Sequence, residues 1–209
     1  MRQVIEEFGR LPTTCISDAM QGLHNFDPAV KPLKEEYRIC GRAITVKMPA
    51  GDNMMVLAAM KEARPGDILV IDSGNHAYRA VAGDFVIGLA QTLGLGGVVA
   101  YGTIRDVQSI KALNFPVFCT GTTVACSQKI GAGAINVPIA CGHAIVHPGD
   151  IIIGDADGVV TVPQGEEAAV LAAARKKLES DEERARRVLA DARSAMEYIN
   201  HLVAAGRGK

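Results

Sequence analysis

Two short, uninterrupted apolar runs constrain the fold more than any other feature of this chain: residues 67–72 (DILVID) and residues 96–102 (GGVVAYG). Continuous apolar runs of this length, bounded by turn residues, are typical of strands buried on both faces of a parallel sheet. A helical pattern at 84–94 lies between them, and a shorter one at 105–113 leads to a further strand at 115–121. This alternation predicts an α/β fold in which crossover helices connect parallel strands.

The flanking segments extend this pattern. Residues 37–48 are expected to form a strand, and residues 11–23 and 52–63 to form helices, the first capped by Thr13 or Thr14. From residue 135 to 163 the chain becomes rich in short β patterns with Gly, Pro and Asp, as in hairpins. Two Pro-Gly-Asp turns, at 65–67 and 148–150, each precede an apolar strand, and we interpret them as shared turn chemistry and not as a repeat.

The C-terminal segment is different in character. Residues 165–202 are highly charged with a narrow apolar stripe, which predicts one long helix. A helix with so little core of its own is expected to pack on the domain or on a neighbouring subunit. We therefore expect a catalytic domain at 1–163 and a helical tail at 164–209.

Composition excludes several classes of function. The net charge is −1 and aromatic residues make up only 4% of the 209 residues, so no nucleic-acid footprint and no membrane-surface patch is expected. No apolar stretch approaches the roughly 20 residues of a membrane span, and the N-terminus carries no signal-peptide pattern. The five cysteines form no C-x-x-C pair, which favours reduced thiols in a cytoplasmic protein.

Charged residues at the ends of the predicted strands are the first candidates for chemistry. Arg105 and Asp106 follow the predicted strand at 96–102, and Gly83 and Asp84 lie at the start of the predicted helix at 84–94. Ligands of parallel α/β sheets bind at such strand-to-helix junctions. Free helix-start amides and Arg105 could hold an anion, while Asp106 and Asp84 could hold a hard cation. A surface ion pair and a helix-start acid explain the same residues without any ligand.

The spacing Asp84, twenty residues, Arg105-Asp106 resembles the D-x20-R-D signature of the class II pyruvate aldolases. These are the 4-hydroxy-4-methyl-2-oxoglutarate aldolases of the wider group that includes the regulator of ribonuclease activity A. Further blocks carry the resemblance across nearly the whole chain after residue 11: GDN (51–53), ARPGDILVIDSG (63–74), GGVVAYGTIRDV (96–107), NFPVF (114–118), INVPIACGHAIVHPGD (135–150) and GDADGVVTVP (154–163). The resemblance implies a swivelling β/β/α sandwich, similar to a phosphohistidine domain, with a long C-terminal helix.

The resemblance also implies roles for these residues. Asp106 would be the protein ligand to Mg²⁺ or Mn²⁺, and Asp84 would hold a water of that metal. Arg105 would contact the 2-oxo acid and stabilise the enolate. The backbone after Gly83, at Asp84, Phe85 and Val86, would bind the substrate carboxylate.

Two further acids are implied by the resemblance. Asp18 occupies the place of an acid on the N-terminal helix that is Glu elsewhere in the family. Glu182 is the best match to an acid that the C-terminal helix of a neighbouring subunit contributes, with Glu179 or Glu183 as alternatives in register. A solvated helix face explains Glu182 equally well.

The function implied is a divalent-metal-dependent lyase that cleaves 4-hydroxy-2-oxo acids, including dicarboxylic ones, to pyruvate and decarboxylates oxaloacetate. The alternatives are a non-catalytic module that regulates a ribonuclease, and a related lyase with another 2-oxo acid substrate. The regulators lack the Asp that follows the Arg, whereas this chain has Asp106. A homotrimer or homohexamer is also implied.

Several other residues remain open from the sequence. His143 or His147 could be phosphoryl carriers, although turn or strand positions explain both, and His76 could line the cleft. Ser127, Gln128 and Lys129, in a loop at 122–133 that matches no familiar pattern, could face the distal end of a substrate or solvent. Asp52 or Asn53 could cap the following helix or form an anion-binding turn.

Overall fold

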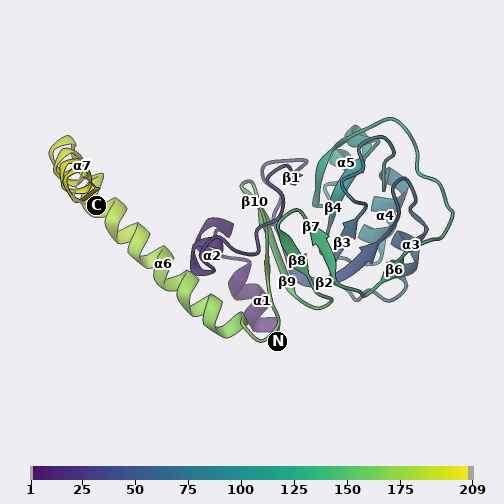
Figure 1. Cartoon of the computed structure of the whole chain (residues 1–209), viewed down its shortest axis with the longest axis horizontal. Helices are drawn as coiled ribbons and strands as arrows, with labels where there is room; N and C mark the ends of the chain where they lie inside the picture. Colours follow the sequence, from purple (N-terminus) through teal and green to yellow (C-terminus); the bar gives the residue numbers. More distant parts are fainter. Residues whose placement is uncertain (1, 207–209) are drawn as a thin grey trace.

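The strands at the centre of the molecule form one eight-stranded sheet. This computed structural model describes residues 2–206. The strand order is β1-β5-β4-β3-β2-β9-β10, with β6 paired to β2, and Figure 1 shows the sheet between helices on either side. The strands are β1 (Lys31–Pro32), β2 (Ile39–Lys47), β3 (Ile68–Asp72), β4 (Gly97–Ile104), β5 (Val117–Thr122), β6 (Ala134–Ile135), β7 (Ile139–Cys141), β8 (Ala144–Val146), β9 (Ile151–Asp155) and β10 (Gly158–Val162).

The helices follow the expected crossovers. Strands β2, β3, β4 and β5 are parallel neighbours, joined through α3, α4 and α5, whereas β9 and β10 pair antiparallel. The helices are α1 (Arg2–Phe8), α2 (Thr13–Ala19), α3 (Met54–Met60), α4 (Asp84–Thr92), α5 (Val107–Leu113), α6 (Glu167–Val188) and α7 (Ala192–Gly206). The predicted α/β fold with parallel strands is confirmed.

The alternation of side chains along each strand divides the core between the two faces of the sheet. On β3, Leu69 and Ile71 pack against α3, α4 and α5, while Ile68 and Val70 pack on the opposite face. The β7–β8 hairpin covers that opposite face. All five residues of β3 are buried, which confirms a strand enclosed on both sides.

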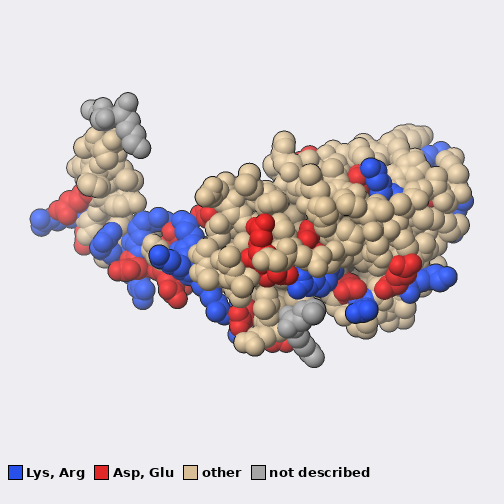
Figure 2. All heavy atoms as spheres, turned by 60° about the horizontal axis from the view of Figure 1, so that its bottom comes forward, with Lys and Arg blue, Asp and Glu red and all other residues tan. Residues whose placement is uncertain are grey.

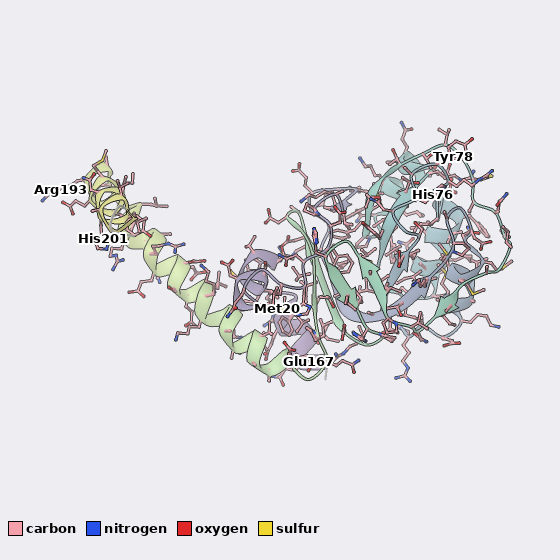
Figure 3. The ribbon with its side chains drawn as sticks, viewed as in Figure 1. Met20, His76, Tyr78, Glu167, Arg193 and His201 are labelled. Carbon is pink, nitrogen blue, oxygen red and sulfur yellow. The ribbon has the colours of Figure 1, made fainter. Side chains whose placement is uncertain are left out.

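A third core cluster anchors the C-terminal region to the domain. Val170 and Leu171 of α6 pack with Phe8 of α1, Ile16 of α2 and Ile153 of β9. Arg42 on β2 donates a hydrogen bond to Glu167 at 2.8 Å, which fixes the start of α6. Helices α6 and α7 together form an arm that begins here. In Figure 3, Met20 and Glu167 lie at the base of this arm, and Arg193 and His201 lie at its far end.

The prediction of one continuous C-terminal helix is wrong. The helix ends at Val188, and α7 begins at Ala192 with a new direction, as Figure 1 shows. Asp191 accepts hydrogen bonds from the amide and hydroxyl of Ser194, at 2.8 and 3.2 Å. An Asp at this position caps a new helix N-terminus and therefore competes with continuation of the old one.

The prediction that Thr13 or Thr14 caps the short helix near the N-terminus is also wrong. Pro12 precedes α2, and no side chain caps it. The amide and hydroxyl of Thr13 instead donate to the carboxylate of Asp155, at 3.0 and 2.6 Å. A tertiary contact to β9 thus replaces the local cap. The sequence pattern did not predict α1.

The two Pro-Gly-Asp turns share their chemistry, as expected. Asp67 accepts a hydrogen bond from the amide of Arg64 at 2.8 Å, and Asp150 accepts one from the amide of His147 at 2.8 Å. Gly66 and Gly149 both have φ near +90°, at 89° and 87°, which glycine adopts without strain.

The charged residues gather on the arm more than on the domain. Figure 2 shows Lys and Arg beside Asp and Glu along α6, whereas much of the visible face of the domain is uncharged. Within residues 2–206, no helix has the length and apolar character needed to cross a membrane.

Candidate active site

The predicted residues around Gly83 and Arg105 line one cavity of about 200 Å³. It lies where α4 begins, where β4 passes into α5, and beside the loop after β5. Its lining residues are Asn53, Ala80, Ala82, Gly83, Asp84, Phe85, Val86, Arg105, Asp106, Cys126, Ser127 and Lys129. Gly83, Asp84, Phe85, Val86, Arg105 and Asp106 are thus brought together.

An irregularity in β4 sets the position of Arg105. The pairing of β4 with β5 shifts between Ala100 and Thr103, so that β4 carries one extra residue. Such a bulge bends a strand and redirects the side chains that follow. Beyond it, Ile104 pairs with Ala82, and the Arg105 amide donates to the Ala82 carbonyl at 3.0 Å. This pairing places Gly83 directly beside Arg105.

Gly83 permits a close approach between the two helix starts. A Cβ atom on Gly83 would lie 2.4 Å from Asp106 Oδ2 and 3.2 Å from Arg105 Nε. Both distances are shorter than ordinary contacts, so only glycine fits without moving the charged pair. Arg105 Nε lies 3.3 Å from Asp106 Oδ2.

Asp106 has a left-handed backbone conformation, with φ 58° and ψ 40°. A residue other than glycine pays a conformational cost there, although Asp tolerates it better than most. Residues in such conformations concentrate at functional sites. The Asp106 carboxylate makes no capping hydrogen bond to α5. It faces Gly83 instead.

Asp84 begins α4, whose first amides have no carbonyl one turn earlier in the helix. Its carboxylate accepts a hydrogen bond from the Phe85 amide at 2.7 Å. The Phe85 amide is therefore engaged by a side chain, and a substrate carboxylate would have to displace Asp84 from it. The Phe85 ring is 76% exposed and points away from the core.

The loop after β5 forms another wall of the cavity, with Cys126, Ser127 and Lys129 among the lining residues. The sequence left Ser127 and Lys129 open between a substrate-facing and a solvated position; both line the cavity, and Lys129 is also exposed to solvent. Gln128 does not line the cavity, and its amide donates to the Gly51 carbonyl at 2.7 Å.

Asp52 holds this loop in place. Its side chain is fully buried and accepts hydrogen bonds from the amides of Met54 (2.7 Å), Gly131 (3.1 Å) and Ile130. Burial raises the pKa of the Asp52 carboxyl, but these amide hydrogen bonds outweigh burial and bring the pKa below its ordinary value. Asp52 therefore contacts the start of α3, as the capping interpretation expected, and also organises the loop.

Asp18 and Glu182 lie on other elements and do not line this cavity. Asp18, on α2, forms an ion pair with Lys177 of α6 at 3.1 Å. Glu182 is exposed on α6. Figure 1 places α2 and α6 on the opposite side of the sheet region from α4. Within one chain these two acids are therefore separate from Arg105 and Asp106.

The histidines do not line the cavity either. His147 is in the second Pro-Gly-Asp turn, where its amide donates to Asp150. His143 lies between β7 and β8. His76 lies in the loop before α4, as Figure 3 shows, and its carbonyl is 3.4 Å from the Thr103 hydroxyl. The turn and strand interpretations of His143 and His147 agree with their positions, whereas His76 does not line the cavity as the sequence suggested it could.

Comparison with known proteins identifies the family of this chain. The family model described as RraA-like, Aldolase/RraA, matches residues 13–161. A protein of Halalkalibacterium halodurans, provisionally named 4-hydroxy-4-methyl-2-oxoglutarate aldolase, is 50% identical over 199 residues, with 95% of each chain covered. The chain belongs to the RraA-like family.

Solved structures agree with this family and its fold. RraAS2 of Streptomyces coelicolor, described as an unusual member of the RNase ES inhibitor RraA protein family, has a TM-score of 0.77 and 26% identity, with 88% of this chain and 96% of that chain covered. The RNA-processing inhibitor RraA from Thermus thermophilis has a TM-score of 0.66 and 27% identity, with 74% and 95% covered. The predicted fold class, including the C-terminal helix, is confirmed, and the named relatives include both an aldolase and inhibitors of RNA processing.

The donor set of this RraA-like chain fits a hard divalent cation. Asp84 and Asp106 both line the cavity and supply carboxylate oxygens, the ligands that Mg²⁺ and Mn²⁺ prefer. Among residues 2–206 no group of three or more His, Cys, Asp or Glu side chains is arranged to hold a metal. Mg²⁺ does not need such a group, because it binds through one or two carboxylates and keeps several waters.

Besides Ala80 and Ala82, sequence reasoning missed the lining role of two residues with polar side chains. Asn53 was considered as a helix cap or as part of an anion-binding turn, and Cys126 only as one of five thiols. Both lie in segments that pair with each other, since the Asn53 amide donates to the Gln128 carbonyl at 3.1 Å. One sequence feature could have indicated that Cys126 lies near the site: its loop follows β5 and so lies at the same edge of the sheet as Arg105.

Proposed function

We propose that this chain is a divalent-metal-dependent lyase that cleaves 4-hydroxy-2-oxo acids to pyruvate and decarboxylates oxaloacetate. The observation that carries the proposal is the convergence of Asp84, Arg105 and Asp106 on one cavity at the N-terminus of α4. The aldolase name of a relative at 50% identity supports the reaction class.

The substrate carboxylate would bind at the start of α4. Amides of the first helical turn and the positive end of the helix dipole favour an anion there. Gly83 keeps this position open, because a side chain would fill the space beside Asp106. The carboxylate would replace Asp84 as the partner of the Phe85 amide, which frees Asp84 to accept a hydrogen bond from water.

Arg105 would stabilise the charge that develops during cleavage. Breaking the C3–C4 bond of a 4-hydroxy-2-oxo acid leaves an electron pair on the pyruvyl fragment, which delocalises onto the 2-oxo oxygen. A guanidinium beside that oxygen interacts more strongly with the enolate than with the ketone, and such a difference raises the rate. A Mg²⁺ or Mn²⁺ held by Asp106 would polarise the same oxygen as a Lewis acid.

Asp84 would accept the proton of the C4 hydroxyl. Cleavage requires that this hydroxyl lose its proton as the carbonyl forms, and a carboxylate acting directly or through one water can accept it. Decarboxylation of oxaloacetate yields the same pyruvate enolate with CO₂ as the leaving group, so it needs no additional residue. Neither reaction requires a Schiff-base lysine.

Asp18 and Glu182 could take part only from a neighbouring copy of the chain. Both lie on the surface of the α2–α6 region, outside the cavity of their own chain. We propose a homotrimer or homohexamer in which this region approaches the cavity of the next subunit.

A pyruvate-release assay tests the proposal. Protein stripped of metal is given Mg²⁺ or Mn²⁺ and offered oxaloacetate and 4-hydroxy-2-oxoglutarate. We expect metal-dependent pyruvate release that is lost in Asp106→Ala and retained in Glu35→Gln, a control at an exposed acid outside the cavity. Metal-independent turnover, or full turnover by Asp106→Ala, would refute the mechanism.

The second candidate function is a non-catalytic regulator of a ribonuclease, favoured by the names of the structural neighbours. Asp106 argues against it here, because the regulators lack this acid. If no substrate is turned over, a binding experiment with ribonuclease partners becomes the deciding measurement.

A further inference from the structure

We propose that Cys126 is a site of reversible covalent modification, at which a small disulfide of an aminothiol forms a mixed disulfide that occupies the cavity. The expected consequence, loss of turnover, rests on the proposed function. The bond itself forms at the thiol whether or not the chain is a lyase, so the two claims can be tested separately.

Cys126 is the most accessible thiol of the chain. It is exposed and lines the cavity, whereas Cys15, Cys119 and Cys141 are buried and Cys40 is partly buried. Burial raises the pKa of Cys40 to about 12 and that of Cys119 to about 11, which keeps both thiols protonated at neutral pH. The thiolate is the form that attacks a disulfide, and the rate also depends on access to the sulfur. We therefore expect Cys126 to react first.

The loop that carries Cys126, residues 123–131, is tied to the segment before α4. The Ala80 amide donates a hydrogen bond to the Ala125 carbonyl at 2.9 Å, and the Arg79 guanidinium donates one to the Cys126 carbonyl at 2.8 Å. These contacts fix the backbone of Cys126 in the wall of the cavity. A group bonded to its Sγ atom therefore remains beside the cavity.

An unpartnered polar atom in the same cavity indicates which kind of group it accepts. Asn53 lines the cavity and is only 5% exposed, yet its Oδ1 atom has no hydrogen-bond partner among the described residues. Most buried polar side-chain atoms in proteins have a partner. Asn53 also lies against the loop, since its amide donates to the Gln128 carbonyl at 3.1 Å, two residues after Cys126. An N–H group on a molecule bonded to Cys126 would supply the missing donor.

The exchange needs no oxidant other than the disulfide. The Cys126 thiolate attacks one sulfur of the disulfide, and a new S–S bond forms as the original S–S bond breaks. Cys126 is oxidised, and the other half of the disulfide is reduced and leaves as a thiolate that takes up a proton. An aminothiol carries its nitrogen two carbons from the sulfur, which is short enough for a cavity of about 200 Å³. Excess free thiol reverses the bond.

The attached group would exclude the substrate. Arg105 and Asp106 line the same cavity as Cys126, so the group occupies the space in which a 2-oxo acid would bind. The lining residues include no second cysteine, so no internal disulfide within the cavity competes with the mixed disulfide. Small disulfides should therefore stop turnover, and reduction should restore it.

The mass of the intact protein after exposure to cystamine measures the bond directly. We expect a single cysteamine adduct that peptide analysis maps to Cys126 and that dithiothreitol removes. Pyruvate release, measured in parallel with Mg²⁺, should fall in proportion to the adduct and return on reduction. An adduct that forms first at Cys40, or none at Cys126, would overturn the site. Full turnover by the Cys126 adduct would overturn its blocking role.

A thiol moved along the same loop provides the matched control. Gln128 is exposed and does not line the cavity, so the double variant Cys126→Ser, Gln128→Cys shifts the thiol out of the cavity by two residues. This variant should accept cysteamine and keep the rate of pyruvate release that it has before treatment. Cys126→Ser alone should form no adduct and keep its own untreated rate. Equal inactivation of the double variant and the wild-type protein would contradict occupation of the cavity.

Asn53→Ala tests the preference for an aminothiol. The variant keeps the backbone contact with Gln128 and removes Oδ1. A hydrogen bond to a charged group corresponds to about a 10-fold or larger change in an equilibrium constant. We expect the variant to lower the equilibrium constant for the Cys126 adduct by about this factor with cystamine, and less than about threefold with diethyl disulfide, which has no N–H group. Equal changes with the two disulfides would refute the role of Asn53.

The two readouts distinguish failure of the modification from failure of the lyase. Untreated protein that releases no pyruvate from any substrate would refute the proposed lyase function, while the adduct mass would still test Cys126. Protein that turns over its substrate and takes up no cysteamine at Cys126 would refute the modification and leave the lyase function intact.

Discussion

The site depends on the absence of a side chain at Gly83 and on the unusual backbone conformation of Asp106. Gly83 leaves room for the Asp106 carboxylate, and the left-handed conformation of Asp106 directs that carboxylate toward Gly83. The D-x20-R-D spacing predicted which residues meet. The spacing could not predict the geometry of their contact. The left-handed conformation of Asp106 and the need for glycine at position 83 produce no periodic pattern in the sequence.

We expect Gly83→Ala to fold but to lose at least about 100-fold in kcat/KM for pyruvate release, because a displacement near 1 Å in a catalytic group has an effect of this size. The new methyl group would lie 2.4 Å from Asp106 Oδ2 and force the carboxylate away. Gly88, in the same helix, has no atom within 4 Å of its added Cβ. Gly88→Ala should therefore keep full activity and gain about 0.5–1 kcal/mol of stability. Equal activity of the two variants would contradict the close-approach argument.

At the scale of single elements, local sequence predicted structure well where the interaction is local. Both Pro-Gly-Asp turns close through a carboxylate that accepts the amide three residues earlier. The break between α6 and α7 also has a local cause, the capping residue Asp191. The sequence analysis missed this break because the charged pattern typical of a solvent-exposed helix continues through it. The extra residue in β4 and the contact of Thr13 with Asp155 depend on partners far along the chain, so no local pattern could predict them.

The two turns should respond differently to loss of their Asp. Asp150 is buried and accepts hydrogen bonds from the amides of both His147 and Gln164, whereas within residues 2–206 the Asp67 side chain accepts one from the amide of Arg64 alone. We expect Asp150→Ala to lower the free energy of unfolding by about 2–4 kcal/mol and Asp67→Ala by about 0.5–1.5 kcal/mol. Urea unfolding of both variants measures the difference, and equal losses would show that burial of the turn is unimportant.

Asp52 should contribute a pH-dependent part of the stability. Its pKa in the folded state is below the unfolded value of about 3.9. Its contribution is therefore complete above about pH 5 and is lost as the pH falls through the folded pKa. Between pH 5 and pH 3, the wild-type protein should lose more free energy of unfolding than Asp52→Asn does. Parallel curves for the two proteins, with Glu35→Gln as control, would refute this role.

At the scale of the whole molecule, the arm formed by α6 and α7 carries an apolar face that the described residues leave about half exposed. Met196, Ile199, Leu202 and Val203 of α7 are each about half exposed. The sequence predicted that this tail must pack on something, and the structure shows that α7 extends away from the domain (Figure 1). We propose that this face packs on another copy of the chain.

We expect the protein to sediment with at least three times its chain mass of 22.0 kDa. The variant Ile199→Lys, Leu202→Lys should reduce this mass, because two buried charges would be placed in an apolar contact. Sedimentation velocity at several concentrations measures both. A wild-type protein that remains a monomer at all concentrations would contradict the proposed contribution of Asp18 and Glu182 from a neighbouring subunit.

The central claim is that this cavity generates a pyruvate enolate with Arg105 and Asp106, and exchange of the pyruvate methyl protons with D₂O tests it without knowledge of the natural substrate. An enolate that forms reversibly must pick up deuterium at C3, which proton NMR follows directly. The account predicts exchange that requires Mg²⁺ or Mn²⁺, disappears in Asp106→Ala and falls sharply in Arg105→Lys. Exchange no faster than in buffer with metal present, or exchange that persists in Asp106→Ala, would contradict it.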